Sequence, residues 1–402
     1  MINVNQLIRA YDRLRKASGW KASTQRFGIN LLSETTSLFH DVRTEEYKPG
    51  KGKSFILNEQ GRLRLIRALE PRDMILEHAL CDNILNPTLQ PYIIHDNGAS
   101  MVGKGISFTR RRFEQHLHKF FRQYGRDGYI LKIDFRKFFD NINHDALLKE
   151  FAEHIPQEII DIFLKPILQS NAVDVTGFED KYTMDNIYNA LEHYMAGGKS
   201  EGKTILHKSL AIGAPISQIA GIYLPYRIDS WCKTVKGCKF YHAYMDDRII
   251  IHHNKQFLRQ ILAEITQIAE TVGIHINSRK TQIIKLTRPF VFLKTRYFLT
   301  DTGKLIKKIP KDVVKRQRRK MRKLARLASE GTISLKDFQT QYKSWRGDKQ
   351  RYHAYYTLRR LDYEERKLAE WIKSTHSTQT AQNLPRDLPS TAIIMSAKPK
   401  LT

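Results

Sequence analysis

Two adjacent aspartates, Asp246 and Asp247, stand between two apolar stretches of the sequence. The segment before the pair reads Phe240-Tyr241-His242-Ala243, followed by Tyr244-Met245, and the segment after it reads Arg248-Ile249-Ile250-Ile251. This pattern predicts two short strands joined by a tight hairpin. Neighbouring carboxylates repel one another, and a buried sheet is an unfavourable place for both unless a divalent cation neutralises them. The sequence therefore predicts a metal site at this turn.

A third aspartate ends another predicted strand. Tyr129-Ile130-Leu131-Lys132-Ile133-Asp134 follows a Gly-containing break and is rich in β-forming residues. If this strand lies next to the hairpin, Asp134 joins Asp246 and Asp247 at one sheet edge. Three carboxylates there can hold two Mg²⁺ ions, one activating a primer 3′-hydroxyl and the other neutralising a triphosphate and the leaving pyrophosphate. The acids thus indicate nucleotidyl transfer.

The chain is strongly basic, with 68 Lys+Arg against 41 Asp+Glu and a formal net charge of +27. A charge of this size favours a polyphosphate partner, and nucleic acid is the leading candidate. The sequence contains no apolar run of membrane-spanning length and no secretion signal at its start, so we expect a cytoplasmic protein without a membrane partner.

Cysteines and paired histidines predict no further metal site. The three cysteines form no CxxC pair and are expected to be buried thiols. His116 and His118 lie two apart on a predicted helix, and His252 and His253 are neighbours on a predicted strand. Side chains at both spacings are expected to diverge.

Basic residues concentrate between Lys304 and Arg326, where twelve of them accompany a single acid, Asp312. Val314, Met321 and Leu324 supply an apolar face, and five of the cations recur on the other side at three- to four-residue spacing. A solvated helix is the simple alternative, but like charges with so few acids repel one another, which favours an anionic partner. The cationic stripe consists of Lys311, Lys315, Arg319, Arg322 and Arg326.

The apolar spacing predicts an α+β fold class. It indicates a hairpin around Ser54–Ile66, a helix over Phe257–Thr271, and strands at Ile274–Asn277 and Thr281–Ile284. We therefore expect the chain to have four parts. Residues 1–128 form an N-terminal, mainly helical part, and residues 129–300 form an α+β part with an insertion at about 165–208. Residues 301–373 form a basic helical part, and residues 374–402 form a disordered tail.

Four motifs resemble those of reverse transcriptases. Tyr244-Met245-Asp246-Asp247 is similar to the YxDD signature, and the segment 133–142 is similar to the element that carries the first metal-binding aspartate. Phe292-Leu293 with Lys294-Thr295-Arg296-Tyr297 resembles the FLG element, and Ser344-Trp345-Arg346-Gly347 resembles the SWxG element. The order and context resemble prokaryotic members in particular, which implies a bacterial or phage-encoded protein.

The resemblance implies a right-hand polymerase with fingers in the first part, a split βαβ palm and a helical thumb. It implies that Asp134 and Asp246 ligate two Mg²⁺ ions, for which Mn²⁺ can substitute, with support from Asp247. It also implies that Tyr244 and Met245 lie against the primer terminus. The implied partners are an RNA template, a DNA or RNA primer and deoxynucleoside triphosphates.

Further contacts are carried over by the same resemblance. Arg62 and Arg64 match basic finger residues that bind the triphosphate, a role suited to the planar fork of arginine. Phe139 matches the aromatic residue that excludes a ribose 2′-hydroxyl. Lys280 and Trp345 match positions that contact nucleic acid, as the cationic stripe also does.

Ile212-Gly213-Ala214-Pro215-Ile216-Ser217-Gln218 resembles the (I/V/L)GxxxSQ element of reverse transcriptases in diversity-generating retroelements. Ile212 stands where most relatives have a glutamine that touches the incoming nucleotide and template, with Gly213 and Gln218 completing the nucleotide-binding element. The resemblance implies error-prone copying, notably opposite template adenines, and an accessory basic protein as a possible partner.

Two alternatives remain at this stage. A reverse transcriptase of phage defence shares the palm and differs in priming and product. A non-catalytic RNA-binding scaffold would share the fold but not need the three acids. A group II intron maturase or a fused RNase H is disfavoured, because the sequence ends soon after the thumb-like element and carries few acids beyond residue 374.

Overall fold

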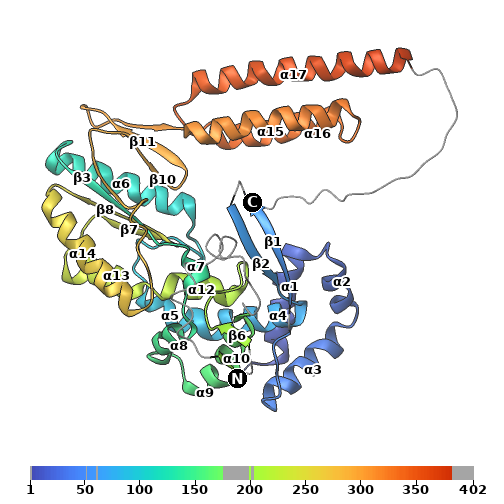
Figure 1. Cartoon of the computed structure of the whole chain (residues 1–402), viewed down its shortest axis with the longest axis vertical. Helices are drawn as coiled ribbons and strands as arrows, with labels where there is room; N and C mark the ends of the chain where they lie inside the picture. The colour runs from blue at the N-terminus through green and yellow to red at the C-terminus, as the bar shows by residue number, and fades with distance from the viewer. Residues whose placement is uncertain (1, 51, 60–61, 175–198, 201–202, 383–402) are drawn as a thin grey trace. The chain divides into compact units, whose positions relative to one another are not determined.

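The protein is described from a computed structural model that covers residues 2–50, 52–59, 62–174, 199–200 and 203–382. The fold is mixed helix and sheet, and the chain divides into two compact units (Figure 1). The first unit comprises residues 1–120 and 128–284, and the second comprises residues 121–127 and 285–402. None of the helices in the described part of the chain combines the length and apolar character needed to cross a membrane.

The first unit begins with three amphipathic helices. α1 starts at a capping box, in which the Asn3 side chain accepts from Gln6 N and the Gln6 side chain accepts from Asn3 N. The predicted hairpin is present as the antiparallel pair β1 and β2, and helices α4, α5 and α6 follow. The bounds are α1 Val4–Ser18, α2 Ala22–Ile29, α3 Leu31–Arg43, β1 Lys53–Glu59, β2 Arg62–Ala68, α4 Pro71–Leu80, α5 Asn86–Leu89 and α6 Ile106–Tyr124.

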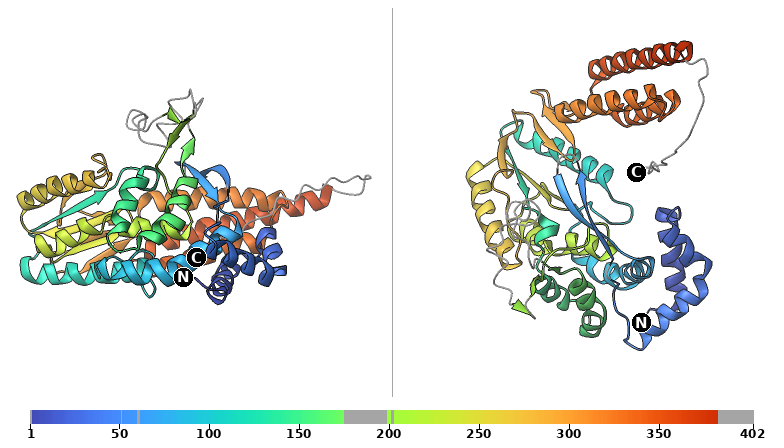
Figure 2. Two further views of the ribbon diagram at one scale, coloured as in Figure 1. Left: turned by 90° about the horizontal axis from the view of Figure 1, so that it is seen from below. Right: turned by 45° about the vertical axis from the view of Figure 1, so that its right-hand side comes forward.

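A four-stranded sheet in the order β7-β8-β3-β9 forms the middle of the first unit. β3 and β8 are antiparallel, as are β7 and β8. Helix α14 lies on one side of this sheet and α6 on the other, as Figure 2 (left) shows. Both faces are covered, which explains why Ile249, Ile250 and Ile251 are all buried. The bounds are β3 Tyr129–Asp134, β7 Tyr241–Tyr244, β8 Asp247–His252, α14 Lys255–Thr271 and β9 Gln282–Lys285.

Short elements connect these strands. They are α7 Phe138–Asn141, α8 His144–Ala152, α9 Gln157–Ile159, α10 Lys165–Ser170, β4 Val173–Asp174, β5 Lys199–Ser200, β6 Lys203–Leu206, α12 Pro215–Tyr223 and α13 Tyr226–Ser230. Much of the insertion predicted at about 165–208 lies outside the described residues; of its described parts, residues 165–170 are helical and β5 and β6 pair antiparallel.

The second unit contains a three-stranded antiparallel sheet in the order β10-β11-β12 and three helices packed side by side. Met321, Ala325, Phe338 and Leu361 are among the residues that form the core between the helices. The cationic segment divides at Pro310, because a proline suits the start of a helix better than its interior. The bounds are β10 Phe290–Phe292, β11 Thr295–Leu299, β12 Leu305–Lys308, α15 Lys311–Ser329, α16 Leu335–Lys349 and α17 Tyr355–Gln382.

Two local predictions were wrong. Ile274–Asn277 is not a strand, because Gly273 turns the chain with a φ of 71° and only Ile276 forms a β-bridge, with Phe135. Helix α17 continues past residue 374 to Gln382, where the sequence suggested a tail without fixed structure. Polar residues do not end a helix that is already nucleated by packing upstream.

Candidate functional site

Two aspartates lie at the turn between β7 and β8. Tyr244 pairs with Asp247, so Met245 and Asp246 form a two-residue hairpin loop. Met245 has a φ of 51°, a left-handed conformation that is unfavourable for a residue with a side chain. Phe135 N donates to the Asp246 carbonyl at 3.4 Å, which ties the loop to the end of β3. The turn is therefore held in a specific, strained conformation.

The structure brings Asp134 to the same sheet edge, directly opposite Asp247 in the β3–β8 register. The Asp134 carboxylate accepts from Asn277 Nδ2 at 3.0 Å and forms an ion pair with Lys280 Nζ at 3.2 Å. Lys132 Nζ lies 3.7 Å from Asp247. Two lysines thus offset part of the negative charge of the three acids.

The electrostatics of this edge fit a divalent cation. Burial raises the pKa of Asp247, and the neighbouring Asp246 and Asp134 raise it further, against the effect of Lys132. A cation would favour the ionised form of the Asp247 carboxyl group. Carboxylate oxygens are ligands that hard cations such as Mg²⁺ prefer. Asp134 and Asp247 pair at this edge with Asp246 in the adjoining loop, although in the described part of the chain the three carboxylates are not all within 4.8 Å of one another.

A buried ion pair stabilises the hairpin formed by β7 and β8. Arg248 is fully buried and its guanidinium pairs with Asp229 on α13 at 3.1 Å. The same Arg248 side chain donates to the carbonyl of Met245, and Tyr241 donates its hydroxyl to Asp229. The strained loop is therefore held by a network of buried polar groups.

The Ile212-Gly213 segment precedes α12, and a buried glutamate holds the first turn of that helix. Gly213 has a φ of 99° and Ile212 is half-buried, while Gln218 is exposed. Ile216 N donates to the buried Glu77 carboxylate on α4 at 3.2 Å. Burial raises the pKa of Glu77 to about 8.

Phe139 lies on α7 against the backbone of α12. A Cβ atom added to Gly221 would come within 2.9 Å of the Phe139 ring, so the ring occupies space that any side chain at position 221 would need. Phe138 packs on the same ring, with centroids 5.3 Å apart. Phe139 is only half-buried, and one part of it stays accessible.

The remaining predicted site residues lie in two places. Arg62 and Arg64 are on β2, and their side chains are outside the described residues. The five cations of the stripe are exposed on α15, and Val314, Met321 and Leu324 face the core, as predicted. Trp345 is half-buried in the second unit and stacks on Tyr342.

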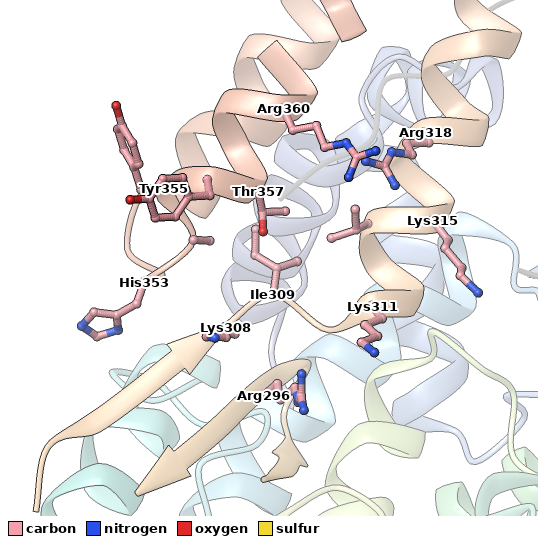
Figure 3. A pocket seen from close by; sticks show the side chains of 13 residues that line it. Arg296, Lys308, Ile309, Lys311, Lys315, Arg318, His353, Tyr355, Thr357 and Arg360 are labelled. Carbon is pink, nitrogen blue, oxygen red and sulfur yellow. The ribbon is translucent and has the colours of Figure 1, made fainter. Parts of the chain in front are cut away.

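A cationic pocket of about 590 Å³ lies in the second unit (Figure 3). Two members of the stripe, Lys311 and Lys315, line it. Figure 3 shows the guanidinium groups of Arg318 and Arg360 beside each other at one side. The other charged lining residues are Arg296 and Lys308.

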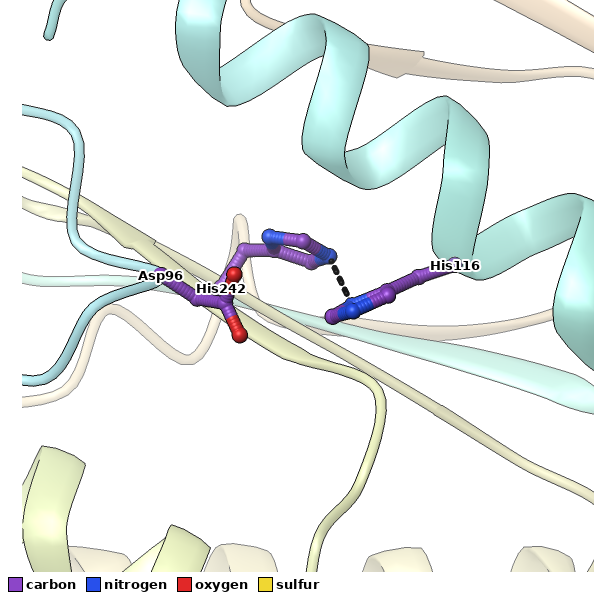
Figure 4. A group of neighbouring side chains, drawn as sticks. All are labelled: Asp96, His116 and His242. Carbon is purple, nitrogen blue, oxygen red and sulfur yellow. Dashed lines mark hydrogen bonds between the residues drawn. The ribbon is translucent and has the colours of Figure 1, made fainter.

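A different group of possible metal ligands, Asp96, His116 and His242, is buried where α6 packs on β7 (Figure 4). His116 Nδ1 and His242 Nε2 share a hydrogen bond of 2.9 Å. Asp96 is already paired with Arg112 at 2.9 Å and with Lys233 at 2.8 Å. Burial lowers the pKa of His242 to about 3 and of His116 to about 4, so neutral imidazoles form this contact. A polar network with two cations inside it is a poor fit for Mg²⁺.

Sequence reasoning missed several of these partners. His116 and His242 are far apart in the sequence and gave no signal. For His252 and His253 the predicted divergence was wrong, since their rings stack at 4.4 Å because β8 ends at His252. Arg248 did carry a signal, because a charge inside an apolar strand requires a buried partner. The three cysteines are free and buried, as predicted.

Comparison with known proteins shows the family to which the chain belongs. Residues 56–297, more than half of the chain, match the family described as reverse transcriptase (RNA-dependent DNA polymerase). That activity is a nucleotidyl transfer. The chain belongs to the reverse transcriptase family.

Two individual proteins are similar over part of their length. A Saccharomyces cerevisiae protein described as a COX1/OXI3 intron 1 protein is 24% identical over 187 residues, which cover 44% of this chain and 21% of that protein. The chain thus matches about a fifth of the length of this curated relative. The structure of telomerase from Candida albicans with a fragment of telomeric RNA is 14% identical, with a TM-score of 0.42, and the match covers 82% of this chain and 59% of the telomerase chain. Because the sequence identity and the TM-score of this match are low, it supports no conclusion about the function of the chain.

Proposed function

We propose that this chain polymerises deoxynucleotides on an RNA template at the edge formed by Asp134, Asp246 and Asp247. The observation that carries the proposal is the β3–β8 register, which sets Asp134 opposite Asp247 with Asp246 in the adjoining loop. Two Mg²⁺ ions, or Mn²⁺ in their place, would activate the primer hydroxyl and neutralise the triphosphate. Asp134 and Asp246 would ligate both ions, and Asp247 would support them.

The chain's own residues would do the positioning. Tyr244 and Met245 would lie against the primer terminus, and Arg62 and Arg64 would bind the triphosphate. We propose that residues 1–128 are the fingers, 129–300 the palm and 301–373 the thumb, whose last helix continues to Gln382. The exposed cations of α15, together with Lys280 and Trp345, would contact the template and primer.

Primer extension tests this proposal. Purified protein, an RNA template with an annealed primer, deoxynucleotides and Mg²⁺ should give a full-length DNA product. A scaffold without catalysis, the alternative from another class, would bind RNA with a steep salt dependence and incorporate nothing with either Mg²⁺ or Mn²⁺.

Replacement of Phe139 by alanine should admit ribonucleotides. In the wild type the Phe139 ring would occupy the space that a ribose 2′-hydroxyl needs, and the ring packs against Gly221. We expect the ribonucleotide-to-deoxynucleotide incorporation ratio to rise by about ten- to a hundredfold, measured with single nucleotides. Phe139→Tyr, which keeps the bulk, is the matched control and should retain discrimination. An unchanged ratio in Phe139→Ala would refute the role.

We further propose that the enzyme is error-prone and acts in a diversity-generating retroelement of a bacterium or phage, aided by an accessory nucleic-acid-binding protein. The half-buried aliphatic Ile212 beside the left-handed Gly213 supports this, because it can form no hydrogen bond to a base pair. A reverse transcriptase of phage defence is the second candidate. Near-identical repeats differing at adenines beside the gene would favour the first, and neighbouring defence genes the second.

Replacement of Ile212 by glutamine should restore a polar contact to the nascent pair. We expect misincorporation opposite template adenines to fall about fivefold, the effect of roughly one net hydrogen bond. Sequencing of products from a defined RNA template measures this, and Ile212→Val serves as the control. An error rate that is equal for all three proteins would argue against the assignment.

A further inference from the structure

The first turns of α17 expose an unusual combination of side chains. Tyr356 is 82% exposed and Tyr363 is 52% exposed. Arg359, Arg360 and Arg366 are also exposed and alternate with these tyrosines along the helix. The five residues line one shallow hollow of about 350 Å³, which we call the Tyr–Arg stripe.

Helical geometry explains why these residues share one face. Residues three, four and seven positions apart lie above one another on an α-helix. The opposite face of α17 is apolar, since Leu358, Leu361, Ala369 and Ile372 are all buried against the other helices. The Tyr–Arg stripe is therefore not part of the packing that holds α17 in place.

Two acids of α17 pair with neighbouring helices, although Glu364 also lies 3.8 Å from Arg360 of the Tyr–Arg stripe and Glu370 is exposed. Asp362 accepts from Arg346 Nε at 2.7 Å and from the Tyr342 hydroxyl at 2.6 Å, and both partners are on α16. Glu364 pairs with Arg318 of α15 at 2.8 Å. These pairings leave the outer face with an excess of positive charge.

The stripe continues into the cationic pocket of Figure 3, because Tyr356 and Arg360 line both. Tyr355, 67% exposed, stands at the same end of α17, with its ring edge-on to that of Tyr356 at 5.3 Å. The pocket supplies further cations, among them Lys311, Lys315 and Arg296. Exposed aromatic rings thus lie beside a positively charged hollow.

A solvated helix surface is the simple explanation for the charges. Lys367 Nζ lies 4.9 Å from the centre of the Tyr363 ring, but nothing of this kind explains the exposure of Tyr355 and Tyr356. An anionic polypeptide would use the arginines and have no need of flat rings. Unpaired nucleic acid uses both, since its phosphates bind arginine and its bases stack on aromatic side chains. A duplex presents only phosphates to such a surface because its bases are already stacked and paired.

We propose that the Tyr–Arg stripe binds a single-stranded segment of nucleic acid, with bases stacked on Tyr356 and Tyr363 and phosphates held by Arg359 and Arg366. Seven helical residues set the two rings about 10 Å apart along the helix axis. This separation suits two bases of an extended strand. The Tyr–Arg stripe belongs to the second unit and the aspartate edge to the first. Only the expectation that the strand is template RNA depends on the proposed function.

Binding of a labelled oligonucleotide of about a dozen nucleotides tests the proposal, with affinity measured by fluorescence anisotropy on the full chain. Single-stranded RNA, single-stranded DNA of the same sequence and a blunt duplex are compared. In the double variant Tyr356→Ala/Tyr363→Ala we expect affinity for the single strand to fall at least about 25-fold, roughly fivefold per tyrosine, and affinity for the duplex to change little. Tyr356→Phe/Tyr363→Phe should retain binding.

Salt dependence separates stacking from charge. The alanine variants should leave the slope of log affinity against log salt unchanged, whereas Arg359→Gln/Arg366→Gln should reduce it by about 0.7 for each phosphate that the variant no longer binds. Trp20→Ala removes an exposed aromatic residue from the first unit and serves as the matched control, with no expected loss of affinity. A preference for RNA over DNA would identify an RNA strand, and equal affinity would identify recognition through bases and phosphates alone.

Two results would overturn the proposal. One is an alanine double variant that binds single strands as tightly as the wild type, and the other is an equal loss of affinity for single strand and duplex. Asp246→Asn should bind the single strand normally without extending a primer. If the wild type fails to polymerise while its binding still depends on both tyrosines, the proposed function fails and the Tyr–Arg stripe stands.

Discussion

Replacement of Asp246 by asparagine is expected to reduce deoxynucleotide incorporation at least about a thousandfold. Asparagine keeps the shape of the side chain and removes the charge with which Asp246 would bind the cations. Loss of a metal ligand removes several kcal/mol of transition-state stabilisation, and about 1.4 kcal/mol corresponds to a factor of ten in rate. Single-nucleotide extension under saturating template and primer measures the rate.

The matched control for this experiment is Glu270→Gln, which neutralises an exposed acid at the end of α14. We expect it to leave incorporation within about twofold of the wild type, since screened surface charges contribute little. Thermal unfolding should be the same for Asp246→Asn and wild type, because Asp246 is at a partly exposed loop. Incorporation by Asp246→Asn at a wild-type rate would remove the basis of the proposed mechanism.

Replacement of Arg248 by methionine is expected to destabilise the first unit by about 3–5 kcal/mol. The substitution leaves Asp229 charged, fully buried and without its main partner, which is far more costly than the loss of an exposed pair. The Met245 carbonyl also loses its donor. The midpoint of denaturant unfolding measures the effect.

A second substitution makes this prediction specific. In Arg248→Met/Asp229→Asn no uncompensated charge remains, so the double variant should be more stable than Arg248→Met alone. Arg316→Met, which removes the exposed partner of Asp312, is the control and should change stability by less than about 1 kcal/mol. A double variant less stable than the single one would contradict the account.

Short-range patterns predicted much of this fold. The strand Tyr129–Asp134 and the hairpin around Asp246 were predictable because each buries a continuous apolar run and ends at a polar residue. Helix α14 was predictable from its amphipathic spacing and from Asn254, whose side chain caps its start. In such segments local preference and tertiary packing agree.

The remaining features depend on contacts that the sequence order does not reveal. Asp229 became the partner of Arg248 only because α13 packs against β7 and β8. Asn277 reaches Asp134 from a loop that the alternation pattern assigned to a strand. The neighbourhood of His116 and His242 likewise requires α6 to cross the sheet at β7. Such tertiary pairings set the chemistry of buried polar groups and leave little trace in local periodicity.

The pairing of β3 with β8 has a consequence for sequence change. Side chains alternate between the two faces of a sheet, so removal of one residue within Tyr129–Ile133 would turn every later side chain of the strand to the opposite face. Asp134 would then meet Arg248 in place of Asp247, and Ile133 would leave the interior. Single-residue deletions in this strand should therefore be far less tolerated than most substitutions, and the spacing, more than the identity, of its apolar residues should limit how the protein can diverge.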